Sequence, residues 1–178
     1  MTPAELAALV RTVPDFPVPG VLFRDITTLI AHGEGLAAAV DWLAVRAREA
    51  RADAIAGMEA RGFIFGAAVA IQLGLGFVPV RKPGKLPVPT IGIDYALEYG
   101  NDRLEIDPGA IEQGQRVVLV DDLIATGGTA RAAAGLLRIA GARVDHAVFA
   151  IDLPDLGGAA SLSAIDVQSH ALMAFPGH

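Results

Sequence analysis

Short apolar runs and longer segments of helical spacing alternate along this chain. Residues 33–50 repeat apolar side chains every three or four positions, as at Leu36 and Leu43, and this spacing predicts a surface helix. The same reasoning predicts helices over residues 62–74 and 129–140, and short apolar strands over residues 52–58, 76–80, 116–121 and 143–151. Such alternation of strand and helix is typical of a parallel sheet covered by helices.

The N-terminal segment departs from this alternation. Thr2, Pro3 and Glu5 predict a capped first helix, because Glu5 is placed to complete a capping box. The proline-rich stretch that follows predicts a loop, which becomes extended over residues 21–26.

We expect one domain, residues 1–178, with one excursion from the sheet. The 178 residues, of which 53% are hydrophobic, suffice for a substantial core. Residues 91–106 predict two strands that turn around Gly100 and Asn101, so we expect a small flap over about residues 81–106. The tail, residues 155–178, predicts one weak strand. The predicted fold class is α/β, with a central, mostly parallel sheet flanked by helices.

Composition excludes several classes of protein. The chain has no cysteine, so a disulfide framework and a thiolate metal site are excluded, and a reducing cytoplasm is the simplest location. The N-terminus lacks the basic region and cleavage site of a secretion signal. The net charge of −6 argues against a nucleic-acid-binding face. The four histidines are scattered without metal-ligand spacing.

Residues 62–80 carry no charge and invite comparison with a membrane span. Gly74 and Gly76 would interrupt a helix there, and Pro79 follows. A buried helix followed by a buried strand fits better, so we expect no membrane association.

The stretch "RVVLVDDLIATGGTA", which begins at Arg116, carries the strongest chemical signal. Its four consecutive aliphatic residues predict a strand covered on both faces. Ligands of such sheets bind at the carboxyl ends of the strands, where Asp121, Asp122 and residues 125–129 would lie. Glycine N–H groups, threonine hydroxyls and the N-terminus of the next helix converge there, which predicts an anion cradle.

The two carboxylates would repel a phosphate, so they must face another group. Ionised carboxylates only accept hydrogen bonds, which suits a sugar diol or a metal ion, and their charge would stabilise a developing cation. Without the glycine turn after them, Asp121 and Asp122 would be interpreted as residues of an ordinary turn or helix cap.

Other candidate phosphate sites are weaker. Lys82 and Lys85, the only lysines of the chain, lie with Arg81 in "RKPGK", which by itself favours a solvated, mobile loop. A P-loop is excluded because Gly84 and Lys85 are followed by leucine. A G-x-G-x-x-A match from Gly33 follows no clear strand, so we attribute it to chance.

Several stretches of the chain, in order, resemble the type I phosphoribosyltransferases, and among them those that use adenine. "VVLVDDLIATGGT" resembles the signature that binds phosphoribosyl pyrophosphate (PRPP). "DFPVPGVLFRDIT", "GMEARGFIFG", "VRKPGKLP" and "YALEYG" resemble stretches of the adenine-using members. The resemblance spans about residues 14–153, and several spaced motifs in one order are more specific than any single motif.

The resemblance implies a purine salvage reaction in which adenine and PRPP give AMP and pyrophosphate. Mg²⁺ would be carried on the pyrophosphate, without a direct protein ligand. Asp121 and Asp122 would bind the ribose hydroxyls and stabilise an oxocarbenium-like transition state. The implied 5′-phosphate site consists of Ala125, Thr126, Gly127, Gly128 and Thr129.

The resemblance also implies which residues bind the pyrophosphate and the base. Glu98 would take the N7 proton of adenine as N9 attacks the sugar. The flap would close over pyrophosphate and exclude water. The implied pyrophosphate site consists of Arg61, Arg81, Lys82, Lys85 and Tyr99. The implied adenine site consists of the Phe23 ring, backbone groups of Leu22 and Arg24, and Leu153. In this family a cis peptide bond often precedes the arginine, here between Ala60 and Arg61.

The sequence departs from the family pattern in two places. Residues 155–178 match no motif, and Asp152 stands where the family has glutamate. Two alternatives stay open. The base could be hypoxanthine, guanine, xanthine or orotate, or the chain could be a regulator that senses PRPP and binds nucleic acid, although it lacks the basic face this needs. By analogy with the family we expect a homodimer.

Overall fold

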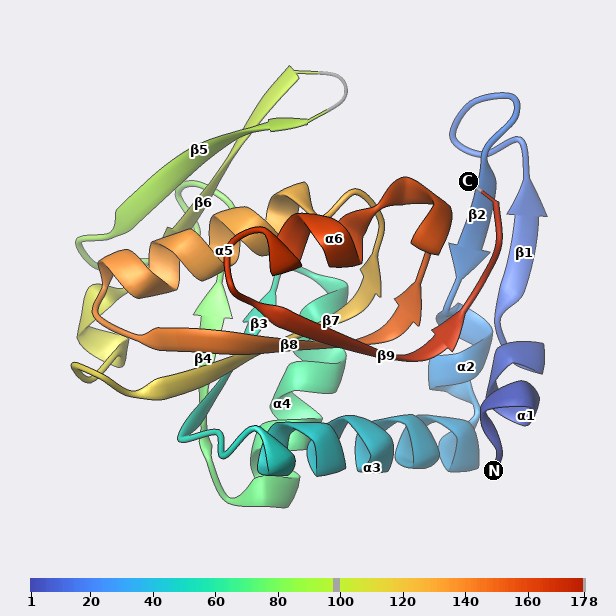
Figure 1. Cartoon of the computed structure of the whole chain (residues 1–178), viewed down its shortest axis with the longest axis horizontal. Helices are drawn as coiled ribbons and strands as arrows, with labels where there is room; N and C mark the ends of the chain where they lie inside the picture. The colour runs from blue at the N-terminus through green and yellow to red at the C-terminus, as the bar shows by residue number, and fades with distance from the viewer. Residues whose placement is uncertain (98–99, 178) are drawn as a thin grey trace.

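The computed structural model describes residues 1–97 and 100–177, and in it helices lie on both faces of a parallel sheet (Figure 1). Among the described residues, this central sheet has in spatial order the strands β4 (Gly76–Val80), β3 (Ala54–Met58), β7 (Arg116–Ile124), β8 (Arg143–Asp152) and β9 (Gln168–Ala174). The aliphatic run 117–120 lies in the middle strand and is fully covered, as its lack of alternation predicted. The predicted α/β class with a central parallel sheet is confirmed.

The helices are divided between the two faces of the sheet. One face carries α3 (Gly33–Glu49) and α4 (Arg61–Leu73), and the other carries α5 (Gly128–Ile139) and α6 (Gly158–Ser163). Leu43 and Phe65 are buried under the first pair. Leu136 and Leu162 are buried under the second. The predicted helices over residues 33–50, 62–74 and 129–140 are confirmed, with ends that differ by at most one residue.

The N-terminal region packs at one end of the sheet. Its elements are α1 (Pro3–Ala8), β1 (Arg11–Pro14), β2 (Leu22–Asp25) and α2 (Thr27–Ala31). The predicted capping box is present: the Glu5 N–H donates to Thr2 Oγ1 at 3.3 Å and the Thr2 N–H donates to Glu5 Oε2 at 2.7 Å. β2 was predicted as an extended stretch. β1 and α2 were not predicted, because segments of four and five residues are too short to display a period.

The flap contains β5 (Ile91–Leu97) and β6 (Gly100–Ile106), which pair antiparallel as predicted. It lies beside α5 and extends beyond the sheet in Figure 1. Gly100 and Asn101 were predicted to form the turn, but both lie in β6, where Asn101 pairs with Ala96. The predicted position of the turn was therefore wrong.

The C-terminal tail contains more structure than the sequence predicted. Its weak strand is confirmed as β9, but α6 was missed, since its six residues contain a single large apolar side chain, Leu162, and so show no helical period in the sequence. Short 3₁₀ turns lie at Pro108–Ala110 and Pro154–Leu156. None of the helices in residues 1–97 and 100–177 combines the length and the hydropathy needed to cross a bilayer.

Candidate active site at the carboxyl ends of the strands

A cavity of about 270 Å³, here called the cradle, lies at the carboxyl ends of β3 and β7. It brings together most of the residues that were predicted to meet PRPP. These are Arg61, Lys82, Asp121, Asp122, Ala125, Thr126, Gly127, Gly128 and Thr129. Their common position follows from the topology, because the strands are parallel neighbours and end at the same edge.

The floor of the cradle is the first turn of α5. The helix begins at Gly128, and its N-terminal amides receive no side-chain cap from the described residues. The preceding Gly127 has φ +84°, and a Cβ there would lie 2.9 Å from the Gly158 carbonyl oxygen. Glycine is therefore required by both the conformation and the approach of α6. The uncapped amides and the dipole of α5 suit an anion.

Asp121 and Asp122 occupy a break in the alternation of β7. Val120 packs on the side of α3 and α4, and so does Leu123, whereas Ile124 packs on the side of α5. Neighbouring side chains of a regular strand point to opposite faces, so the alternation changes phase between Val120 and Leu123, although the register with β8 continues without an inserted residue. Two consecutive carboxylates can therefore line the same cavity. The strand was predicted to end at Asp121, which was wrong.

Arg61, the first residue of α4, directs its guanidinium at this carboxylate pair. Its Nε lies 3.0 Å from Asp122 Oδ2, and the Asp122 side chain is 4% exposed. The contact is ionic, since Oδ2 accepts no hydrogen bond from the described residues. Burial, followed by the Asp122 carboxylate, raises the pKa of Asp121 well above its usual range, while Arg61 acts in the opposite direction. A positively charged ligand would relieve the unfavourable proximity of the two carboxylates.

Gly62 lets α4 approach the carboxylates closely. A Cβ at this position would lie 2.7 Å from Asp121 Oδ1 and 3.1 Å from the Val120 carbonyl oxygen. The "ARG" turn therefore places both the arginine and a close backbone contact at the carboxylate pair.

A second cavity, of about 260 Å³, adjoins the cradle and is mostly apolar. Its lining is Val21, Leu22, Phe23, Arg24, Arg61, Leu123, Ala125, Leu153 and Leu156. All four residues predicted for adenine are therefore brought together here, and Arg61, Leu123 and Ala125 also line the cradle. We call this second cavity the base pocket.

The aromatic wall of the base pocket is fixed by neighbouring side chains. The Phe23 ring packs edge-on against Phe16, with centroids 5.1 Å apart, and the Arg61 guanidinium lies 5.8 Å from the Phe23 centroid. The Arg24 side chain points elsewhere: it donates to Thr12 Oγ1 at 2.6 Å and to the Pro176 carbonyl at 2.8 Å. Only the backbone of Arg24 was predicted to meet the base, and this orientation of the side chain is compatible with that role.

The basic segment "RKPGK" is tied to the end of β3 by an acid that was not predicted. Glu59 Oε2 accepts from Arg81 Nε at 3.1 Å and from the Lys82 N–H at 3.0 Å. Lys82 lines the cradle, whereas Arg81 and Lys85 do not. The parallel pairing of β3 with β4 carries this information, because Met58 is opposite Val80 and Glu59 must then lie beside Arg81.

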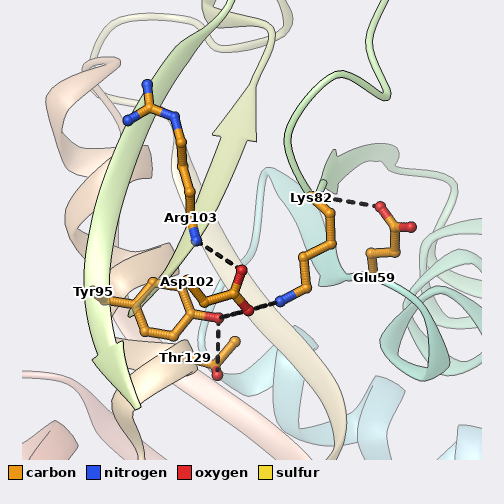
Figure 2. Close-up of polar contacts among 6 residues, drawn as sticks. All are labelled: Glu59, Lys82, Tyr95, Asp102, Arg103 and Thr129. Atoms are coloured by element: carbon orange, nitrogen blue, oxygen red, sulfur yellow. Dashed lines mark hydrogen bonds and ion pairs between the residues drawn. The ribbon is translucent and has the colours of Figure 1, made fainter. Parts of the chain in front are cut away.

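A second missed pair faces Lys82 from the flap. The Lys82 ammonium forms an ion pair with Asp102, and the Tyr95 hydroxyl donates to Asp102 Oδ2 at 3.1 Å (Figure 2). Tyr95 and Asp102 are directly opposite in the β5–β6 register. With Leu97 opposite Gly100, Tyr95 falls opposite Asp102, whereas the predicted turn at Gly100 and Asn101 would have placed another residue opposite Tyr95.

Two predicted site residues are not described by the structure, and the predicted cis peptide bond lies at a different position. Glu98 and Tyr99 lie outside the described residues. The predicted cis peptide bond occurs one position earlier than expected, between Glu59 and Ala60, and not between Ala60 and Arg61. Among the residues that are described, no group of three or more His, Cys, Asp or Glu side chains is arranged to hold a metal ion.

The chain resembles known proteins over nearly its whole length. A model of the phosphoribosyl transferase domain matches residues 27–168. Adenine phosphoribosyltransferase of Novosphingobium aromaticivorans is 74% identical over 178 residues, 100% of each chain. The corresponding protein of Sphingopyxis alaskensis is 60% identical over 97% of this chain and 94% of its own.

Solved structures agree with these sequence relatives. Adenine phosphoribosyltransferase of Thermoanaerobacter pseudethanolicus superposes with a TM-score of 0.93 at 45% identity, covering 98% of this chain and 100% of that one. The Saccharomyces cerevisiae enzyme, solved with an imino-altritol bisphosphate and adenine, gives a TM-score of 0.89 at 37% identity, covering 96% and 97%. The chain therefore belongs to the phosphoribosyltransferase family, and within it to the adenine phosphoribosyltransferases.

Proposed function

We propose that the chain transfers the 5-phosphoribosyl group of PRPP to adenine. N9 of the base forms a bond to C1′ of the sugar, and the bond from C1′ to the pyrophosphate oxygen breaks, with its electron pair leaving on pyrophosphate. The observation that carries the proposal is the junction of two unlike cavities. A polar cradle with an uncapped helix N-terminus adjoins an apolar pocket with an aromatic wall, and Arg61, Leu123 and Ala125 line both.

The cradle would bind the phosphoribosyl part of PRPP. The amides of residues 125–129 would donate to the 5′-phosphate, with the Thr126 and Thr129 hydroxyls as further donors. Asp121 and Asp122 would accept from the ribose hydroxyls, and their charge would stabilise the positive charge that develops at C1′. Burial, and then the Asp122 carboxylate, raise the pKa of Asp121, so positive charge that develops at C1′ would favour its ionised, hydrogen-bond-accepting form.

The base pocket would bind adenine. The ring would stack on Phe23, with Leu153 on its other side and backbone groups of Leu22 and Arg24 at its edge. The adenine bound by the yeast relative supports this choice of base. We assign proton transfer at N7 to Glu98 on the family motif "LEYG".

Pyrophosphate would be bound by Arg61, Arg81, Lys82, Lys85 and Tyr99. The Arg61 side chain is 48% exposed, so it has room to turn from Asp122 towards an incoming pyrophosphate. Closure of the flap over this group would exclude water and limit hydrolysis of PRPP.

The carboxylate pair also suits a cation that arrives with the substrate. Asp122 Oδ2 is buried and accepts no hydrogen bond from the described part of the chain, so it would accept from a water molecule of that ion. Mg²⁺ would neutralise part of the pyrophosphate charge when bound. We propose that it enters on PRPP.

Location and assembly are proposed from composition and from the family. The absence of cysteine fits a reducing cytoplasm, and the family resemblance favours a homodimer. Sedimentation equilibrium would measure the assembly directly, and a monomer at micromolar concentration would contradict the second proposal.

The reaction is tested by incubating the purified chain with PRPP, Mg²⁺ and each base in turn. We expect AMP and pyrophosphate from adenine, and little or no nucleotide from hypoxanthine, guanine, xanthine or orotate. Failure to form AMP from adenine would contradict the proposal, and a faster reaction with another base would change the substrate.

A further inference from the structure

The Tyr95 hydroxyl forms hydrogen bonds both within the flap and to the cradle. It donates to Asp102 Oδ2 at 3.1 Å and lies 3.4 Å from both Lys82 Nζ and Thr129 Oγ1, each of which donates to it (Figure 2). The contact with Thr129 crosses from β5 to the first turn of α5. One hydroxyl therefore joins the flap to a residue that lines the cradle.

Asp102 is the acid that holds the cradle's lysine. Its Oδ2 forms the ion pair with Lys82 Nζ and accepts from Tyr95, while its Oδ1 accepts from the Arg103 N–H at 2.8 Å. Both carboxylate oxygens are therefore engaged. This fixes the carboxylate, and through it the position of the ammonium.

Lys82 is constrained at both ends of its side chain. Its backbone N–H donates to Glu59 and its ammonium is held by Asp102, so both ends of a residue that lines the cradle are fixed (Figure 2). Burial lowers the pKa of Lys82, but the hydrogen bonds and charges of Asp102 and Tyr95 outweigh burial and raise it overall. A long, flexible side chain is thus held charged beside the cradle before any ligand arrives.

We propose that Tyr95 and Asp102 are positioning residues that hold the Lys82 ammonium at the cradle and so prepare it for the phosphate groups of PRPP. The proposal rests on the function proposed above, which uses Lys82 but assigns nothing to Tyr95 or Asp102. An ammonium that is already oriented loses less side-chain entropy when it binds an anion. The 3.4 Å contact of Thr129 with Tyr95 is long, so this hydroxyl can turn to a phosphate at small cost.

The first test is steady-state kinetics with PRPP and Mg²⁺. We expect Asp102→Asn to raise the KM for PRPP about tenfold, because a charge-assisted hydrogen bond to Lys82 is lost. Tyr95→Phe should raise it about threefold, because one neutral hydroxyl is lost. The KM for adenine should stay within about twofold of the wild type in both variants, and the double variant should lose less than the product of the two single effects.

Asp94→Asn is the matched control. Asp94 lies on the same hairpin and pairs with Arg103, but its side chain is 73% exposed and does not face the cradle. An unchanged or lowered KM for PRPP in Asp102→Asn would overturn the proposal, as would an equal rise in Asp94→Asn. A rise in the KM for adenine as large as that for PRPP would also overturn it, since it would indicate general damage to the site.

A second test needs no catalysis. The chain has only two lysines, so lysine labelled with ¹³C and ¹⁵N gives two side-chain signals, and Lys85→Arg assigns them. In both Asp102→Asn and Tyr95→Phe the signal of Lys82 should titrate at lower pH than in the wild type, while that of Lys85 should not move. If Asp102→Asn does not fold, Tyr95→Phe still decides the matter, and an unmoved Lys82 titration would overturn the proposal.

The two tests separate this inference from the proposed function. A wild-type chain that forms no AMP would contradict the function. A wild type that forms AMP, with variants that keep its KM for PRPP and its lysine titration, would contradict only the positioning role.

Discussion

The cradle and the flap are proposed to bind the same substrate, but they are built in opposite ways. The cradle is backbone: amides of residues 125–129 are held by the buried strand β7 and by the packing of α5 and α6. Charged side chains connect the flap to it: Lys82, which lines the cradle, pairs with Asp102, and Arg81 pairs with Glu59 at the end of β3. A backbone site is set by the fold, whereas ion pairs near the surface can be exchanged for the charges of a ligand.

This difference teaches where each kind of change should act. Substitutions in the cradle should affect catalysis and stability together, because the same atoms bind the ligand and close the core. Substitutions of the charged side chains of the flap should affect catalysis alone, because those side chains lie outside the core, unlike Leu104 and Ile106. Variants of both regions test this division.

Removal of both carboxylate charges at the cradle should have the greatest effect on the reaction. We expect Asp121→Asn combined with Asp122→Asn to lower kcat/KM for PRPP about 10³-fold, because the charge that stabilises the developing cation is lost. Steady-state kinetics and calorimetric titration with PRPP would measure this. Asp53→Asn, at the opposite edge of the sheet and paired with Arg116, is the control and should leave kcat/KM unchanged. Wild-type affinity and rate in the double variant would remove the carboxylates from the proposed role.

Loss of the acid at the flap should lower the rate without lowering stability. We expect Glu98→Gln to reduce kcat about 10²-fold or more, the usual scale for general acid–base catalysis, with PRPP binding largely kept. Single-turnover kinetics and a thermal melt would be measured together. Unchanged turnover would exclude Glu98 as the proton acceptor, and a large fall in melting temperature would contradict the division between flap and cradle.

A side chain at the floor of the cradle should affect stability and binding together. We expect Gly127→Ala to lower the free energy of unfolding by about 1–3 kcal/mol, because the residue has positive φ and the methyl group would press on the Gly158 carbonyl. The KM for PRPP should rise about tenfold as the amides shift.

Gly157→Ala is the matched control for this clash. Gly157 has a similar φ of +75°, but a Cβ at this position would meet no other atom of the described residues within 4 Å. Denaturant melts and kinetics of both variants would separate backbone strain from the clash. Equal effects of the two substitutions on KM would show that the approach of α6 is unimportant for the cradle.

The smallest expected effect is on stability, where loss of the Asp121 charge should be favourable although it impairs the reaction. Because the pKa of Asp121 is raised in the folded chain, folding favours its protonated form, and the stability it contributes is lost as pH rises through the raised value. The asparagine in Asp121→Asn does not ionise, so the variant avoids the cost of a buried carboxylate. It should therefore be more stable than the wild type at pH 7. The difference should vanish below the ordinary aspartate pKa of about 4. Thermal melts of the variant and the wild type between about pH 4 and pH 7 would measure this. A variant less stable than the wild type at pH 7 would contradict burial and charge repulsion as the causes of the raised Asp121 pKa.

Much of the fold could be predicted because the long helices and the central strands show a regular spacing of apolar side chains along the chain. The aliphatic run 117–120 identified a central strand, and the helices over residues 33–50, 62–74 and 129–140 end within one residue of their predicted limits. The elements that were missed, β1, α2 and α6, have four to six residues, and contacts with other elements stabilise them: β1 pairs with β2, α2 packs on α3, and α6 packs on α5 and β9. Short segments have no period of their own to read.

The candidate site divides in the same way. The glycine turn 125–129 and its carboxylates could be recognised because they are contiguous, and the fold brings them into one cavity with Arg61. Tyr95 and Asp102 could not be recognised, because their partnership depends on the register of a hairpin whose turn was misplaced. Glu59 was missed because its partners lie on a parallel neighbour more than twenty residues away.

By itself, then, the sequence determined the order of strands and helices, the central place of β7 and the anion-binding turn after it, because each depends on residues that are close along the chain. Only the tertiary structure decided that Asp121 and Asp122 share one cavity, through the shifted alternation of β7. It also decided that Lys82, which lines that cavity, is held by Asp102 and Tyr95. These contacts join residues distant in sequence, and packing and strand register select them from many that local pattern would allow.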